Sequence, residues 1–317
     1  MATLSTQTSM STRTWKAEHR AIGWPGHRQA RTFHSHTDNS GMCKRDVLRT
    51  YRLNSRAVLF FYEDLRCDLD LLANRHHAMP GLTKLLCALN FFGIGSFQNP
   101  VSVVAGMTQA SISWHVSQVL KAIMKRMRKY IVYPTDPAEL QQICSGFMGI
   151  VGMPNVLGAI DCTHIAFTPR SEEESAFWNR KHFHSMNVQV VCDAHLQILN
   201  VAKYPGNCHD TYILAHSALG TQFPEGKYGE GWLLGDGGYG CKPWLLTPLQ
   251  SPRTAAEKRY NEAHGSTRNV IEHTFGVLKG RFRCLARSGE ALQYSAEKVK
   301  LRCIHLTIHP SEHFPAR

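Results

Sequence analysis

Residues 232–285 constrain the fold of this chain most strongly, because an apolar run ending in an aspartate is followed by a long helical pattern. The first run, WLLGDGGYG, predicts a short buried strand and a glycine-rich turn that holds Asp236 at the strand's end. The second run, STRNVIEHTFGVLKGRFRCL, has apolar residues spaced near 3.6 positions and predicts a helix with Ser266 or Thr267 as its N-cap. Glu272 lies within that helix, where spacing alone fits a solvated acid as well as a ligand.

The charge balance narrows the partners that the chain can have. Its 317 residues carry a formal net charge of +12, with 18 histidines not counted, and this length suits one large or two modest domains. Such a charge favours a polyanion, with nucleic acid as the first expectation and an anionic membrane as the second. We expect a soluble protein, because no apolar stretch approaches the ~20 residues that span a bilayer. The ten scattered cysteines predict reduced thiols in an intracellular compartment.

The first 43 residues predict a disordered basic tail. They are rich in Ser, Thr, Arg and His and show no apolar periodicity. A solvated tail without function is the simplest interpretation. A DNA-contacting arm and a mitochondrial transit peptide are alternatives, although no amphipathic helix supports the latter.

Residues 44–133 predict a helical region. Apolar residues recur at helical intervals from Arg49 to Leu72, and residues 82–97 indicate a buried helix closed by Gly93 and Gly95. The following segment, to Ile131, indicates a short helix, a turn, a cap at Thr108 and a long basic helix, which is a helix-turn-helix pattern. An ordinary helical hairpin fits equally well. If the second helix enters the major groove, the DNA-binding candidates are Gln109, Ser111, Ser113, Trp114, His115, Lys121 and Lys125.

Residues 134–155 begin with two prolines and predict a linker, after which the pattern becomes rich in strands. Asp161 lies in the apolar strand pattern VLGAIDCTHIAFTP, where a buried charge is costly unless it binds something. A hairpin is expected over 186–199, with Asp193 as a turn residue. A helix is expected to start near Asp210, with that residue as its N-cap.

Three carboxylates in this order suit a metal site. Aspartates carried by two adjacent strands can converge at one sheet edge, and a helix packed across that edge can add a glutamate. Mg²⁺ prefers oxygen ligands, and two ions ~4 Å apart promote phosphodiester cleavage. A glycosidase with paired carboxylates is the alternative. The positive charge and the preceding helix-turn-helix pattern favour a phosphate substrate.

Six segments in order, spread over about residues 50–300, resemble the PIF/Harbinger transposases and the nuclease-like proteins derived from them. They are GAIDCTHI, NRKHFHSMNVQVVCD, YPGNCHDTYIL, LLGDGGYGCKPWLLTPL, YNEAHGSTRNVIEHTFGVLKGRFRCL and YSAEKV. The resemblance implies an α/β fold: a ribonuclease-H-like catalytic domain, over about 156–300, preceded by the helix-turn-helix region. It implies that Asp161, Asp236 and Glu272 are the catalytic, metal-binding DDE triad, with Mg²⁺ or Mn²⁺ as cofactor. It also suggests that Arg180 and Lys181, or His209, lie near substrate phosphates.

Residues 301–317 depart from the resemblance, since KLRCIHLTIHPSEHFPAR replaces the apolar helix of relatives. We therefore expect an atypical C-terminal tail without the helix that covers the catalytic domain. The leading prediction is a metal-dependent DNA endonuclease derived from a transposase. The alternatives are a catalytically silent DNA-binding or scaffold protein and a simple helix-turn-helix transcription factor. The resemblance also implies a Myb-like partner protein and a location in nucleus and cytoplasm, and a homo-oligomer is an open alternative.

Overall fold

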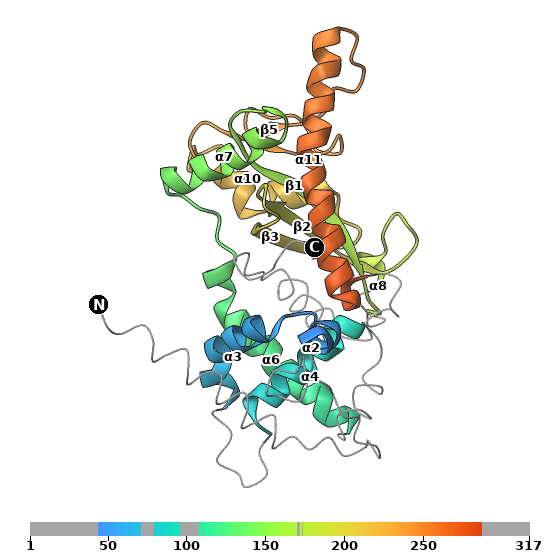
Figure 1. The fold of residues 1–317 in the computed structure, drawn as a ribbon. Coiled ribbons are helices and arrows are strands. Elements are labelled where there is room, and N and C mark those ends of the chain that lie inside the picture. The colour runs from blue at the N-terminus through green and yellow to red at the C-terminus, as the bar shows by residue number, and fades with distance from the viewer. Residues whose placement is uncertain (1–43, 71–78, 96–107, 170–171, 173, 287–317) are drawn as a thin grey trace, which may run out of the picture.

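A computed structural model of the chain describes residues 44–70, 79–95, 108–169, 172 and 174–286. These residues form a mixed α/β structure in which a helical region precedes a region built on a sheet (Figure 1). The helical region contains α2 (Lys44–Tyr51), α3 (Ser55–Leu69), α4 (Gly81–Ile94) and α6 (Gln109–Tyr130). The remaining helices are α7 (Pro137–Val151), α8 (Glu174–Phe177), α9 (Asp210–Ala215), α10 (Ala218–Gln222), α11 (Ala255–Arg281) and the 3₁₀ turn η2 (Arg283–Leu285).

The helical region follows its sequence pattern closely. The Asn54 side chain caps α3 by accepting from the Ala57 N–H at 2.8 Å. Most of α4 is buried, and it ends at Gly95 in the left-handed conformation, φ 68°. Thr108 caps α6 by accepting from the Ser111 N–H, which confirms the predicted cap.

The sheet has five strands in the order β3-β2-β1-β4-β5. β1 pairs antiparallel with β2 and parallel with β4, which in turn is parallel to β5. β2 is buried along its whole length because both faces of the sheet are covered. The predicted hairpin and the predicted strand at Trp232 are confirmed by β1 (Val156–Ala166), β2 (Ser185–Cys192), β3 (Ile198–Pro205), β4 (Trp232–Leu234) and β5 (Leu245–Leu246).

α11 lies along the sheet and contacts β1, β2 and β4 (Figure 1). It begins a full three turns earlier than the sequence pattern predicted, so Ser266 or Thr267 as its N-cap was wrong. The Thr254 side chain caps the helix by accepting from the Glu257 N–H. The Glu257 carboxylate accepts in turn from the Thr254 N–H, which completes a capping box. Thr267 instead lies inside the helix, where its hydroxyl donates to the Ala263 carbonyl at 2.8 Å.

Residues 134–155, predicted as a linker, contain α7. Asp136 caps this helix and Pro137 occupies its first turn, where the missing N–H costs nothing. The buried side chains of Ile143 and Phe147 belong to the common core, and α7 packs on β1 and α11. The proline-rich start therefore marks a helix boundary rather than an irregular connection. The division of the whole chain into domains stays a prediction.

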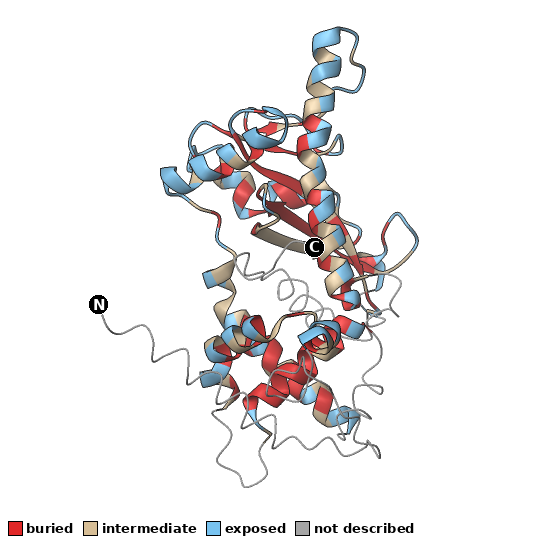
Figure 2. Ribbon diagram, in the orientation of Figure 1, coloured by how far each residue is buried: buried red, intermediate tan, exposed pale blue. Residues whose placement is uncertain are grey.

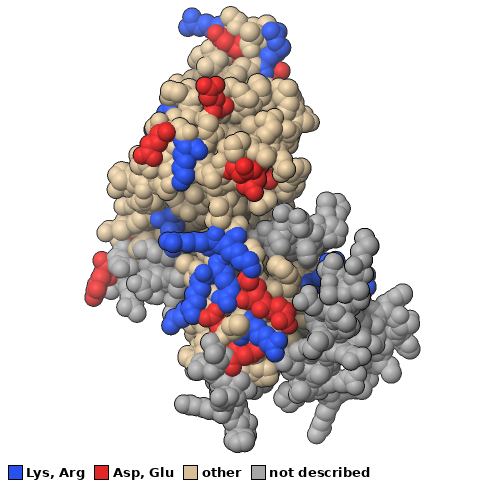
Figure 3. Space-filling view, turned by 90° about the vertical axis from the view of Figure 1, so that its left-hand side faces the viewer, with Lys and Arg blue, Asp and Glu red and all other residues tan. Residues whose placement is uncertain are grey.

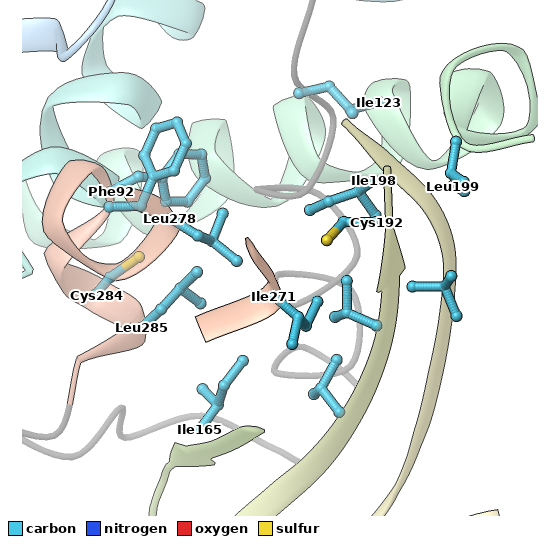
Figure 4. Close-up of a cluster of buried hydrophobic side chains, with 14 of the residues drawn as sticks. Phe92, Ile123, Ile165, Cys192, Ile198, Leu199, Ile271, Leu278, Cys284 and Leu285 are labelled. Carbon is cyan, nitrogen blue, oxygen red and sulfur yellow. The ribbon is translucent and has the colours of Figure 1, made fainter. Parts of the chain in front are cut away.

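One apolar core joins the helical region to the sheet (Figure 2). Leu278 at the end of α11, with Cys284 and Leu285 of η2, gathers beside Phe92 of α4 (Figure 4). A Cβ on Gly95 would lie 2.5 Å from the Arg283 carbonyl carbon, so only glycine permits this approach of α4 to η2.

Several predictions fall outside the described residues. These are the tail over 1–43, the first helix and the turn of the helix-turn-helix pattern within 96–107, and the C-terminal tail over 301–317. Among the described helices, none has the length and apolar character needed to cross a bilayer. The described cysteines are free thiols.

Candidate active site

The pairing of β1 with β4 places the two predicted aspartates side by side. Ala159 of β1 lies opposite Leu234 of β4 in a parallel ladder. Asp161 and Asp236 each follow two residues after that pair, Asp161 in the middle of β1 and Asp236 just beyond the end of β4. The parallel register of the two strands therefore brings these acids to the same level of the sheet.

Asp161 is a half-buried carboxylate whose two oxygens both accept hydrogen bonds. Oδ1 accepts from the Cys162 N–H at 2.7 Å, and Oδ2 accepts from Arg268 Nη1 at 3.0 Å. The pKa of Asp161 is raised to about 6, chiefly by burial and also by the charges of Asp236 and Asp210. The Cys162 bond and the Arg268 charge act in the opposite direction without restoring the ordinary pKa. This site favours an added positive charge.

A tight turn after β4 fixes Asp236. Its Oδ1 accepts from the Gly238 N–H at 3.0 Å, and its main-chain carbonyl accepts from the Tyr239 N–H at 3.2 Å. The Tyr239 side chain is buried, and its hydroxyl lies 3.3 Å from Cys162 Sγ and accepts from Gln189 Nε2 at 3.0 Å. Tyr239 thus ties the turn that carries Asp236 to the two central strands.

Glu272 reaches the same place through Arg268 on the preceding turn of α11. Arg268 Nη2 donates to Glu272 Oε1, while Nη1 of the same guanidinium donates to Asp161. The Glu272 side chain is 53% exposed, compared with 18% for Arg268 and 19% for Asp161. The helix therefore presents the third predicted acid beside the first, with a guanidinium between them.

The donor set consists of carboxylate oxygens, which is the chemistry that Mg²⁺ and Mn²⁺ prefer. In the part of the chain that the structure describes, no three His, Cys, Asp or Glu side chains already stand in an arrangement that could hold a metal ion. The Arg268 guanidinium contacts two of the three predicted ligands. The residues fit a divalent cation chemically, provided that Arg268 moves away from them.

Basic side chains lie near His164, in the C-terminal half of β1. Arg180 and Lys181 are exposed, and their charges lower the pKa of His164, which burial already lowers. Lys279 Nζ donates to the His164 carbonyl at 3.3 Å. His209, the third residue suggested near phosphates, is exposed at the start of α9.

Comparison with known proteins assigns the chain to a family. Residues 160–307 match the family described as DDE superfamily endonuclease, a span that contains all three acids. The human protein named "Putative nuclease HARBI1" is 39% identical over 253 residues, which are 80% of this chain and 72% of the human protein. Its mouse counterpart is 40% identical over 263 residues, 83% of this chain and 74% of the mouse protein.

The chain belongs to the Harbinger-derived family of DDE superfamily endonucleases. A more distant relative of this Harbinger-derived chain is the Arabidopsis thaliana "Protein ALP1-like", 29% identical over 220 residues, which are 64% of this chain and 53% of that protein. No solved structure matches the chain.

The seven residues predicted to bind DNA all lie on α6, but they differ in exposure. Gln109, Trp114 and Lys121 are exposed, and Ser111 and Ser113 are half-buried. The remaining two candidates are less available for binding. His115 is buried beside Trp114, and its role as a DNA contact stays a prediction. Lys125 is exposed, but its ammonium lies 2.5 Å from Asp68 Oδ1, where α3 already balances its charge.

Interleaved acidic and basic side chains cover the helical region (Figure 3). The ion pairs join Asp64 and Asp68 of α3 to three basic residues of α6, namely Lys125, Arg126 and Lys129. The basic end of α6 therefore has a structural role, which a count of lysines and arginines in this Harbinger-derived sequence could not distinguish from DNA binding.

Sequence reasoning missed two groups at the site of this Harbinger-derived chain. Arg268 stands four residues before Glu272, a spacing that indicates contact on a helix, but its bond to Asp161 has no local signal. The buried network of Gln189 and Tyr239 lies on the sheet face opposite α11 and has no sequence motif.

The predictions for Asp193 as a turn residue and for Asp210 as a helix N-cap had different outcomes. Asp193 is a turn residue, as predicted, because its Oδ1 accepts from the N–H groups of His195 and Gln197. Asp210 as an N-cap was wrong by one position, since His209 holds that place. The Asp210 carboxylate instead accepts from Asn187 Nδ2 at 3.0 Å, which binds the start of α9 to β2.

Proposed function

We propose that this chain is a metal-dependent DNA endonuclease with a ribonuclease-H-like catalytic fold, in which Asp161, Asp236 and Glu272 hold Mg²⁺ or Mn²⁺. The observation that carries the proposal is the equivalent placement of Asp161 and Asp236 on adjacent parallel strands, with Glu272 joined to Asp161 through one arginine. Membership of the DDE superfamily endonucleases supports a phosphodiester substrate.

In the proposed reaction, a water molecule gives up a proton to solvent as its oxygen forms a bond to phosphorus; the bond from phosphorus to the leaving oxygen breaks, and that oxygen takes up a proton. Bound divalent cations would supply activation of the water and neutralisation of the leaving oxygen. Asp161 and Asp236 would hold these cations from the sheet, and Glu272 would do so from α11. Arg180 and Lys181 flank the same strand and are available to phosphates of the bound strand.

The exposed positions of α6, especially Gln109 and Trp114, are a proposed second DNA contact within a helix-turn-helix. A Myb-like partner protein that supplies target recognition, a homo-oligomeric state and a location in nucleus and cytoplasm are further proposals that rest on the family resemblance.

Replacing Asp236 by asparagine tests the nuclease proposal. Asn keeps the shape of the side chain and an oxygen for the Gly238 N–H, but removes the charge that binds a cation. Cleavage of plasmid DNA in Mg²⁺ or Mn²⁺ should fall by on the order of 10²–10³-fold, with unchanged circular dichroism. Glu262→Gln, an exposed acid on α11, is the matched control and should cut like the parent.

Equal cleavage by Asp236→Asn and the parent would remove Asp236 from the site. If the parent itself binds DNA but never nicks it in either metal, the silent DNA-binding or scaffold alternative is supported instead. A salt-dependent binding measurement on the same preparations separates these two results.

A further inference from the structure

Arg268 occupies the position between the acids that are proposed to bind metal. Its guanidinium donates from Nη1 to Asp161 Oδ2 at 3.0 Å and from Nη2 to Glu272 Oε1. The side chain is 18% exposed, so the contact with Asp161 is shielded from bulk water and is stronger than a surface pair. One planar group thereby links the strand and the helix that carry two of the three acids.

The Arg268 guanidinium and a divalent cation would compete for the Asp161 carboxylate. Its Oδ1 is already held by the Cys162 N–H at 2.7 Å, and its Oδ2 is held by Arg268. A divalent cation that binds this carboxylate, at Oδ2 or at the remaining lone pair of Oδ1, would stand close to the positive guanidinium. Like charges at such short distances repel strongly in a half-buried site.

The site allows a divalent cation to replace the Arg268 guanidinium beside the acids. Glu272 is 53% exposed and lies one helical turn from Arg268, so its carboxylate can turn toward a metal without any change in α11. The Arg268 side chain has enough freedom, with several rotatable bonds, to leave toward solvent. Asp236 makes its described hydrogen bonds only with its own turn, so the exchange leaves its anchoring intact.

We propose that Arg268 is a built-in counter-ion that holds the acids together in the metal-free protein and is displaced when the divalent cation binds. This inference rests on the proposed function, because it assumes that the three acids are the metal site. Arg268 is then a positioning residue that sets the apparent metal affinity. Until enough cation is present, Arg268 offsets part of the negative charge of Asp161 and Glu272.

Metal affinity measured without any cleavage tests this competition. Mn²⁺ binding to the full chain, followed by the electron paramagnetic resonance signal of free Mn²⁺, should tighten by on the order of tenfold in Arg268→Gln. Arg259→Gln is the control, since it removes the same charge from an exposed position of the same helix and should change the affinity less than about twofold. Unchanged or weaker binding in a folded Arg268→Gln protein overturns the proposal.

Two further arms keep the test decisive. Arg268→Lys retains one positive charge but lacks the planar, delocalised fork that donates to both carboxylates, so its affinity should lie between those of the parent and Arg268→Gln. In the parent protein, the Nε–H resonance of Arg268 should shift and exchange faster with water as Mg²⁺ is added. A resonance that stays protected at saturating Mg²⁺ contradicts displacement even if Arg268→Gln does not fold.

The Asp236→Asn protein separates this inference from the proposed function. Suppose that Mn²⁺ binds the parent, that Asp236→Asn abolishes this binding, and that Arg268→Gln leaves the affinity unchanged. The metal site is then supported, and only the counter-ion proposal fails. If Mn²⁺ binds neither the parent nor Arg268→Gln, both proposals fail together.

Discussion

The ion pairs of the helical region and those of the sheet region use the same chemistry for different ends. Between α3 and α6, three basic side chains surround Asp64 and Asp68. In the middle of β1, a single guanidinium pairs with Asp161 and with Glu272 of α11, while Asp236 adds a third negative charge nearby. The first cluster is balanced by its own residues, whereas the second is short of positive charge. The lesson is that a shortage of countercharge distinguishes a binding site from a structural ion-pair network.

The strongest expected effect on stability tests the structural half of this comparison. Arg126 has a side chain that is 21% exposed and pairs with both Asp64 and Asp68. Arg126→Met should lower the free energy of unfolding by about 1–3 kcal/mol, because two partly buried carboxylates lose their shared partner. Urea unfolding measures this change. Arg66→Met is the control on α3, where a 55% exposed side chain makes only long pairs and should contribute less than about 0.5 kcal/mol.

Equal losses in Arg126→Met and Arg66→Met would break the comparison, because the α3–α6 network would then be an ordinary solvated surface. The loss of unfolding free energy in Arg126→Met should be only modestly larger at low salt, because partly buried ion pairs are weakly screened.

The second prediction concerns pH and has opposite signs in the two regions. The pKa of Asp161 is raised to about 6, chiefly by burial, above the ~3.9 of an unfolded aspartate. Its contribution to stability is therefore complete below about pH 4 and is lost as the pH rises through 6. Metal-free Asp161→Asn should exceed the parent in unfolding free energy by on the order of 1–2 kcal/mol near pH 7.5, and this gain should shrink toward pH 4.

Asp68 provides the contrast. The hydrogen bond from Lys125 is the largest cause that lowers the pKa of this carboxyl, and Arg126 adds to it. A lowered pKa gives stability that is present above about pH 4 and is lost as the pH falls through the folded value. Asp68→Asn should therefore be less stable than the parent at neutral pH, with the difference fading in acid. The same sign for both variants in pH-dependent urea unfolding would contradict the distinction between the two clusters.

The smallest expected effect compares two tyrosine hydroxyls. The Tyr239 hydroxyl accepts from Gln189 at 3.0 Å, and the Tyr130 hydroxyl donates to Asp64 at 2.7 Å. Each change to phenylalanine should cost about 1 kcal/mol of unfolding free energy. Only Tyr239→Phe should also weaken Mn²⁺ binding, by a few-fold, because Tyr239 holds the turn of Asp236. A matching loss of Mn²⁺ affinity in Tyr130→Phe would show that the effect is general loosening.

The juxtaposition of Asp161 and Asp236 follows from local signals in the sequence, whereas their assignment with Glu272 as a catalytic triad rests on the family resemblance and stays a prediction. An aspartate inside or directly after an apolar strand is costly unless it has a purpose, and Asp161 and Asp236 both have this setting. The parallel register of β1 and β4 then brings them together. Asp193 was separable from them for the same reason, since it stands at the turn of a hairpin.

The missed features depend on distant partners or on weak local patterns. The first turns of α11 are largely exposed, so apolar periodicity begins only well inside the helix and the capping box at Thr254 was overlooked. Pro137 indicated a break, although a proline in the first turn also starts a helix. Arg268 and Asp161 are 107 positions apart, and Lys125 and Asp68 are 57 apart, so no sequence window contains either pair.

The course of α11 mechanically links the two halves of the molecule. Its middle carries Glu272 beside the sheet, and its end carries Leu278 into the apolar cluster beside Phe92 of α4. These two positions are six residues, or roughly 9 Å, apart on one continuous helix. Because Glu272 and Leu278 belong to one continuous helix, the position of Glu272 depends on packing beside α4 as well as on packing against the sheet.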